Sequence, residues 1–176
     1  GIDDEQTIAE LTKMFPQKGL KKIGIATSIH HLGVGKLRIT GYKEALPDKE
    51  KDFYIANSSR PEVLREKIER MLVEDRIEAV LCSDFESTMQ VYRTAYEKNI
   101  RIPQDLKVIG FISKDIATYL APSISYIDQF PEKIGRGAMD MLIERLENRV
   151  PKGNAVREKT ISTRLEQLES TEFVNS

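Results

Sequence analysis

The sequence contains few of the residues on which catalysis or metal binding usually depends: its 176 residues include no tryptophan, one cysteine and two histidines. The single Cys82 cannot form a disulfide within the chain, which is compatible with a reducing cytoplasm. His30 and His31 are adjacent, and no cysteine or carboxylate cluster completes a zinc site with them. No Gly-x-Ser-x-Gly motif occurs, and two histidines in one loop make a Ser-His-acid triad a poor interpretation. We therefore expect no enzyme, no metal ion and no cofactor.

Long apolar runs and a strong net charge are also lacking. No run approaches the roughly 20 apolar residues that span a bilayer, so we expect no contact with a membrane. The start, GIDDEQTIAE, is acidic and has no apolar core of the kind found in signal peptides. A formal net charge of −1 gives no overall attraction to DNA. Because the chain does not begin with methionine, we expect a fragment whose DNA-reading part, if it has one, lies outside these residues.

Helical and strand patterns alternate along most of the chain. Apolar residues at helical spacing, or short β-branched runs, are separated by glycine, proline and polar turns. This order predicts an α/β protein with a parallel sheet and helices on both faces, in three layers. We expect helices at residues 4–15, 36–46, 58–75 and 84–99, and strands at 21–27, 51–57, 78–83 and 106–111.

Ligands bind such sheets outside the carboxyl ends of the strands. The loops that leave these ends begin near Thr27, Asn57, Ser83 and Ile112. The loop at residues 28–35 contains both histidines, so we consider these as possible ligand contacts. Its GVGK stretch lacks the spacing of a phosphate-binding Walker loop. Cys82 ends an apolar strand and is expected to be a small buried residue.

The last third of the chain has a different character. Residues 114–122 predict a short helix and residues 123–129 an extended segment. A long amphipathic helix is expected at 131–149 and a polar strand within 156–168. The tail at 169–176 is expected to be loose.

The stretch IPQDLKVIGF, residues 102–111, gives the clearest local structure. Pro103 fixes its own φ and disfavours helix at the preceding residue, and Asp105 can bond to backbone groups in the turn. A buried strand follows, and Gly110 lets the backbone pass close to a neighbour. These properties explain a turn and a strand, but they indicate no function by themselves.

Six segments together resemble the lactose-repressor and galactose-repressor (LacI/GalR) family of transcription regulators. In order they are GLKKIGIAT, LRITGYKEAL, AVLCSD, NIRIPQDLKVIGF, APSISYIDQFPEKIGRGAMDML and LESTEF. The strongest is IPQDLKVIGF, which is similar to the family signature Ile-Pro-x-Asp-hydrophobic-x-Val-x-Gly-Phe. The Arg-x-x-Gly-Tyr set at Arg38, Gly41 and Tyr42 is second, and the resemblance covers nearly the whole chain.

The resemblance implies an effector-binding domain of the periplasmic-binding-protein-like type I fold, with two lobes. Residues 1–129 would form most of the C-terminal lobe. Residues 130–176 would supply a crossover helix and strand that normally pack on an N-terminal lobe, followed by a tail. A small effector, commonly a sugar or nucleobase, would change the geometry of a homodimer in the cytoplasm. Operator DNA would be bound by a head absent from this chain. Because half the packing surface is missing, we expect self-association or a rearranged C-terminal third.

Ligand positions follow from the resemblance residue by residue. Arg38 matches an arginine that reaches ligand hydroxyls or carboxylates with its fork of donors. Ser83 and Asp84 match an Asn-Asp pair, although helix capping explains them equally well. Ile112 stands where the family usually has an aspartate, which puts a conventional sugar effector in doubt. The candidate ligand-binding set is Arg38, Asn57, Ser83, Asp84, Ile112 and Gln129.

Three functions therefore compete. The sensing part of a transcription regulator is the leading hypothesis, and it would act by a ligand-biased equilibrium between two arrangements of the lobes. A solute-binding protein of a transport system has the same fold, but the signature at residues 102–111 is closer to the regulators. A small α/β enzyme would need an activated nucleophile or an acid cluster at the strand ends, and the sequence has neither.

Overall fold

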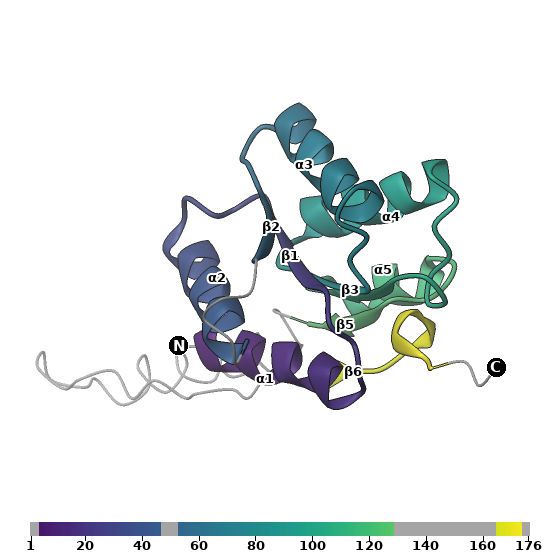
Figure 1. The fold of residues 1–176 in the computed structure, drawn as a ribbon, viewed down its shortest axis with the longest axis horizontal. Coiled ribbons are helices and arrows are strands. Elements are labelled where there is room, and N and C mark those ends of the chain that lie inside the picture. The colour runs from purple at the N-terminus through teal and green to yellow at the C-terminus, as the bar shows by residue number, and fades with distance from the viewer. Residues whose placement is uncertain (1–3, 47–52, 129–164, 174–176) are drawn as a thin grey trace, which may run out of the picture.

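The computed structural model describes residues 4–46, 53–128 and 165–173. Helices and strands alternate through most of the chain (Figure 1). The helices are α1 (Asp4–Gln17), α2 (Gly33–Ala45), α3 (Pro61–Val73), α4 (Phe85–Glu97), α5 (Lys114–Tyr119) and the short 3₁₀ helix η1 (Glu169–Thr171). The strands are β1 (Ile23–Thr27), β2 (Tyr54–Asn57), β3 (Ala79–Cys82), β4 (Lys107–Gly110), β5 (Ser125–Ile127) and β6 (Leu165–Glu166).

The strands form one sheet in the order β2-β1-β3-β4-β5-β6. The pairs among β1 to β4 are parallel, as the alternating pattern predicts, and β5 adds a further parallel pair with β4. Only β6 is antiparallel, where Tyr126 pairs with Glu166 and Ile127 with Leu165. The predicted parallel sheet is therefore confirmed, with one antiparallel edge strand. Within the described ranges, no helix combines the length and apolar character needed to cross a membrane.

Helices cover the two faces of the sheet separately. In Figure 1, α1 and α2 lie on one side of the strands, and α3 and α4 lie on the other. Each face has its own apolar cluster. Ile8, Phe15 and Tyr42 pack against one face, and Leu64, Ile68 and Val91 are part of the cluster on the other. The three-layer α/β/α arrangement is thus confirmed, with an apolar cluster on each face of the sheet.

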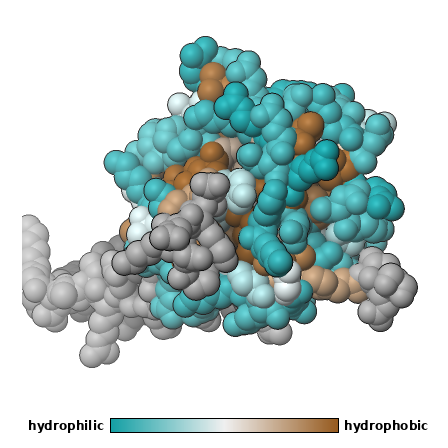
Figure 2. Space-filling model, in the orientation of Figure 1, coloured by the Kyte–Doolittle hydropathy of each residue, from teal (hydrophilic) through white to brown (hydrophobic). Residues whose placement is uncertain are grey.

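The edge strand β2 is only partly covered. Figure 2 shows apolar residues beside β2, whereas the outer faces of α2 and α3 are mainly hydrophilic. Tyr54 and Ile55 are half-buried, and the preceding Phe53 is exposed. β2 therefore marks one side of the domain, and the carboxyl ends of β1, β3 and β4 lie nearer the middle of the sheet.

Tyr42 ties α2 to two strands through its hydroxyl group. The hydroxyl donates a hydrogen bond to the Ile23 carbonyl at 2.6 Å and accepts one from the Tyr54 amide at 3.0 Å. The side chain is fully buried, and burial raises the pKa of the phenol to about 12. The hydroxyl therefore stays protonated and able to donate throughout the physiological pH range.

Replacing Tyr42 with phenylalanine is expected to lower the free energy of unfolding by about 2 kcal/mol, because a buried carbonyl and a buried amide lose their partner. Urea denaturation measures this change, with an unchanged slope indicating an intact native state. The matched control is Tyr119→Phe at an exposed hydroxyl. Equal stabilities of the two variants would show that the Tyr42 bonds contribute nothing.

Two details of the predicted elements are wrong. Helix α2 begins at Gly33, so the glycines expected in the preceding loop belong to its first turn. The tail is not loose at 169–173. Ser170 is fully buried, accepts a hydrogen bond from the Ser125 amide at 2.7 Å and donates one to the Val108 carbonyl at 2.5 Å. The helix expected at 131–149, and most of the strand expected within 156–168, lie outside the described residues.

Candidate ligand-binding site

The strand order reverses between β1 and β3, which forms the topological switch point of the sheet. From β1 the chain crosses to β2 on one side and then returns to β3 on the other. The connecting loops leave in opposite directions at such a point, and open α/β sheets bind ligands there. Ser28 follows β1 and Asp84 follows β3. These two residues mark the switch point at the carboxyl edge of the sheet.

Asp84 bridges the switch point and caps α4. Its Oδ2 accepts hydrogen bonds from the Ser28 amide at 2.8 Å and the Ser83 hydroxyl at 3.1 Å. Its Oδ1 accepts from the Ser28 hydroxyl at 2.7 Å and the Ser87 amide at 2.9 Å. A carboxylate has about four acceptor sites, so these bonds fill its capacity. The expected capping of α4 is confirmed for Asp84, and the carboxylate is engaged entirely within the protein.

Arg38 connects three elements at the same edge. Its Nη1 donates to the Ser83 carbonyl. Its Nε and Nη2 donate to Oδ1 of Asp4, at 3.0 and 2.7 Å. The guanidinium carbon lies 4.2 Å from the centre of the Phe111 ring, a favourable cation–π distance. The Arg38 side chain is only 3% exposed, so its charge is balanced by Asp4 rather than by water.

Asp4 reaches Arg38 because α1 lies unusually close to α2. A Cβ atom at Gly41 would lie 2.2 Å from the Glu5 carbonyl oxygen, a distance that real Cβ atoms do not adopt. Glycine thus lets the first turn of α1 touch the backbone of α2. Gly41 stands three residues after Arg38, one turn further along the same face of α2. The close approach and the ion pair are therefore parts of one contact.

The other predicted site residues differ in their surroundings. Ser83 is fully buried beside Asp84. Ile112 is 5% exposed and packs in the apolar cluster with α4 and α5, so little of its side chain faces the edge. Asn57 ends β2, and its carbonyl and side-chain oxygens accept hydrogen bonds from Lys67 at 2.7 and 3.2 Å. Gln129 lies outside the described residues.

The structure thus gathers Arg38, Ser83 and Asp84 around the switch point, and Asn57 lies two strands away from β3. Sequence reasoning missed Ser28 and Asp4. Ser28 directly follows a predicted strand, so its position was a usable signal. Asp4 opens a predicted helix, and no local sequence pattern connects it with Arg38. None of this tests the ligand roles, which remain predictions.

Cys82 and the two histidines have different surroundings. Cys82 is fully buried, and burial raises the pKa of its thiol well above the usual range, as expected for a small core residue. The His30 and His31 rings meet edge to face, with centroids 5.5 Å apart. In the described part of the chain, no group of three His, Cys, Asp or Glu side chains is placed to hold a metal ion.

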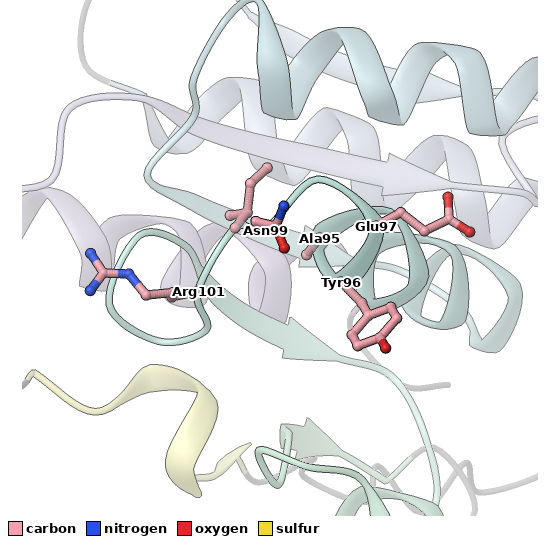
Figure 3. A pocket seen from close by; sticks show the side chains of 6 residues that line it. Ala95, Tyr96, Glu97, Asn99 and Arg101 are labelled. Atoms are coloured by element: carbon pink, nitrogen blue, oxygen red, sulfur yellow. The ribbon is translucent and has the colours of Figure 1, made fainter.

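A surface hollow lies at the opposite edge of the sheet, where α4 ends and the chain turns into β4 (Figure 3). In Figure 3 the Tyr96, Glu97 and Arg101 side chains extend from its rim in different directions. They do not converge on a common point as the side chains of a specific binding site do. The lining residues are Ala95, Tyr96, Glu97, Asn99, Ile100 and Arg101.

The switch point and the layered, mostly parallel sheet define a ligand-binding class of α/β domain. The pattern of the periplasmic binding protein-like domain family matches residues 12–171, so the chain belongs to this family. The chain is 31% identical over 144 residues to the ribose operon repressor of Haemophilus influenzae, covering 78% of this chain and 43% of that protein. It is 26% identical over 149 residues to the HTH-type transcriptional repressor PurR of Aliivibrio salmonicida, with the same coverage of 78% and 43%.

Solved structures agree with these relatives. The Escherichia coli transcriptional repressor ascG superposes with a TM-score of 0.78 at 26% identity, over 96% of this chain and 62% of that one. A LacI family transcriptional regulator from Enterococcus faecium with bound ribose has a TM-score of 0.78 at 20% identity, over 99% and 65%. The predicted resemblance to LacI-family effector-binding domains is confirmed. The chain spans less than half the length of the curated relatives named above.

Proposed function

We propose that the chain is the effector-sensing part of a LacI-family transcriptional repressor. It would bind a small molecule at the carboxyl edge of its sheet and thereby bias the affinity of the whole protein for operator DNA. The observation that carries this proposal is the cluster of Arg38, Ser83 and Asp84 at the switch point of a sheet whose family includes such repressors. A binding function needs only such positioned polar groups, without a nucleophile or general base.

The proposed effector is a sugar-like compound or a related metabolite. Support comes from the ribose operon repressor, by its name, and from the ribose bound to the Enterococcus faecium regulator. In this chain Ile112 is a buried core residue at the end of β4. A sugar would therefore lack a carboxylate at that position and would depend more on contacts from Arg38 or from the other lobe. The predicted roles of Asn57 and Gln129 are part of the same proposal.

The division at residue 129 is likewise our proposal. Residues 1–129 would form most of one lobe, and the segment that follows would cross to another lobe. Residues 165–173 lie beside β4 and β5, so this part of the tail packs on the same sheet. We also propose that the complete protein acts in the cytoplasm as a homodimer, because two operator half-sites are matched by two-fold symmetry.

A ligand screen on the full-length protein tests the proposal. Sugars, sugar phosphates and nucleobases are added one at a time, and both the melting temperature and binding to genomic DNA fragments are measured. At least one compound is expected to stabilise the protein and to change its DNA affinity about 5- to 150-fold. A signal peptide encoded upstream, in place of a helix-turn-helix, would instead identify a solute-binding protein.

A further inference from the structure

Lys107 is a buried cation to which the proposed function gives no role. It is the first residue of β4 and is 7% exposed. Its Nζ donates one hydrogen bond, to the Pro103 carbonyl at 2.9 Å, although an ammonium group has three N–H donors. Among the described residues Lys107 has no carboxylate partner. Lysine is rarely buried without such a partner, because its charge loses hydration, and burial accordingly lowers the pKa of the Lys107 ammonium.

A second lysine and an aromatic ring lie beside this ammonium group. Nζ of Lys107 is 4.4 Å from the centre of the Phe173 ring, and Nζ of Lys18 is 4.8 Å from the same centre. The two nitrogens can therefore be no further apart than the sum of these distances. Cation–π attraction holds each charge near the ring but neutralises neither. Because the edge of an aromatic ring is itself positive, the potential beside Phe173 favours an anion.

The acidic side chains near Lys107 are bonded to other groups. Asp105 precedes it by two residues and accepts hydrogen bonds from the Arg101 amide at 2.8 Å and from its guanidinium group at 3.0 Å. The Glu78 carbonyl accepts from the Lys107 amide at 3.0 Å, but the Glu78 carboxylate accepts from the Lys21 amide at 3.3 Å. Neither carboxylate forms an ion pair with Lys107, so its charge is left without a counter-ion in this part of the chain.

The tail fixes the position of the ring. Three residues before Phe173, the Ser170 amide donates to the Ser123 carbonyl at 2.9 Å and its hydroxyl donates to the Val108 carbonyl at 2.5 Å. Val108 follows Lys107 in β4, so the ring and the ammonium group are attached to the same strand. This part of the tail therefore needs little further ordering when an anion binds, which reduces the free-energy cost of binding.

We propose that Lys107 and Lys18 form, beside Phe173, a binding site for a phosphate group. A phosphate monoester offers three acceptor oxygens and nearly two negative charges at neutral pH, which matches two ammonium groups with unused donors. The site lies at the amino edge of the sheet, and the length of β4 separates it from the proposed effector edge by roughly 10 Å. The inference goes beyond the proposed function and does not depend on it. Inorganic phosphate and phosphorylated metabolites share this chemistry, and the experiment separates them.

Thermal unfolding of the full-length protein tests the site. Sodium phosphate is expected to raise the melting temperature with saturation, half of the effect being reached at about millimolar phosphate, and sodium chloride at equal ionic strength is not. A hexose 6-phosphate is then compared with phosphate and with the unphosphorylated hexose. Tighter binding of the hexose phosphate than of phosphate identifies a metabolite site, and equal binding identifies a site for phosphate itself. Equal responses to phosphate and chloride would overturn the proposal.

Three lysine variants locate the response. Lys107→Met removes an unpaired buried charge, so without phosphate it is expected to be at least as stable as the parent. Its half-saturating phosphate concentration should rise at least about tenfold, because charge-assisted hydrogen bonds are lost. Lys18→Met removes an exposed charge and should weaken binding by about threefold. Lys13→Met, at an exposed position on α1, is the control and should respond as the parent does. A parental phosphate response in Lys107→Met would contradict the proposal.

Hydrogen exchange covers the case in which Lys107→Met does not fold. In the parent protein, saturating phosphate should slow the exchange of amides in residues 168–173, with little change in the loop at residues 28–32. Protection confined to the loop at 28–32 would mean that phosphate binds at the effector edge, and it would refute the proposal. Unchanged exchange in residues 168–173 would refute it as well.

Discussion

Replacing Gly41 with alanine is expected to lower the free energy of unfolding by about 3 kcal/mol. Replacing an exposed glycine within a helix by alanine usually stabilises a protein by about 1 kcal/mol. At Gly41 the sign reverses, because the added Cβ would lie 2.2 Å from the Glu5 carbonyl oxygen and 3.0 Å from its carbon. These are backbone atoms, so α1 must move as a unit away from α2. The Asp4–Arg38 contact at the same junction is then strained or lost.

Gly33 provides the control on the same helix. A Cβ atom there would have no neighbour within 4 Å, so Gly33→Ala is expected to leave stability unchanged or to raise it by up to about 1 kcal/mol. Both variants are compared by urea denaturation, with helix content checked in the native state. A Gly41→Ala variant as stable as Gly33→Ala would mean that α1 and α2 do not touch as described.

Replacing Arg38 with alanine is expected to cost about 3 kcal/mol in the free energy of unfolding. The change leaves the mostly buried Asp4 carboxylate without its counter-ion and the Ser83 carbonyl without this donor. It also removes the stacking on Phe111. Lysine at this position keeps the charge but not the planar fork, so Arg38→Lys should lie between alanine and the parent.

The double variant Asp4→Ala with Arg38→Ala separates charge burial from packing. Removing the stranded carboxylate should recover part of the stability lost in Arg38→Ala alone, so the double variant is expected to be the more stable of the two. Urea midpoints at constant ionic strength measure the difference. If the double variant is less stable than Arg38→Ala, Asp4 is stabilising through contacts other than the pair.

The helices and strands that could be predicted are those determined by residues within the same short segment. Pro103 and Gly110 bracket β4 because each restricts or frees the backbone at its own position, whatever the rest of the fold does. The apolar stripe of α3 at Leu64 and Ile68 is likewise a local property. Alternation of such segments was enough to predict parallel pairing among β1 to β4 and helices on both faces, but not the strand order or the place of β5 in the sheet.

The arrangement of the site depended on contacts between distant residues, and these were not predictable. Arg38 was assigned to a ligand, but its partner in the structure is 34 residues away and is delivered by the docking of α1 on α2. The choice between Ser83 and Asp84 as the cap of α4 needed the actual backbone geometry. The tail was expected to be loose as chain ends often are. Ser170 is instead buried and held by hydrogen bonds to Ser125 and Val108.

The relation between ligand and DNA binding tests the central claim most directly. With the full-length protein and a compound from the screen, ligand affinity is measured by calorimetry with and without saturating operator DNA. If the chain senses an effector for a repressor, operator must change ligand affinity by the same factor by which ligand changes operator affinity, because binding free energies are linked reciprocally. We predict a factor of at least about 5 in both directions. Identical ligand affinities with and without operator would contradict the account.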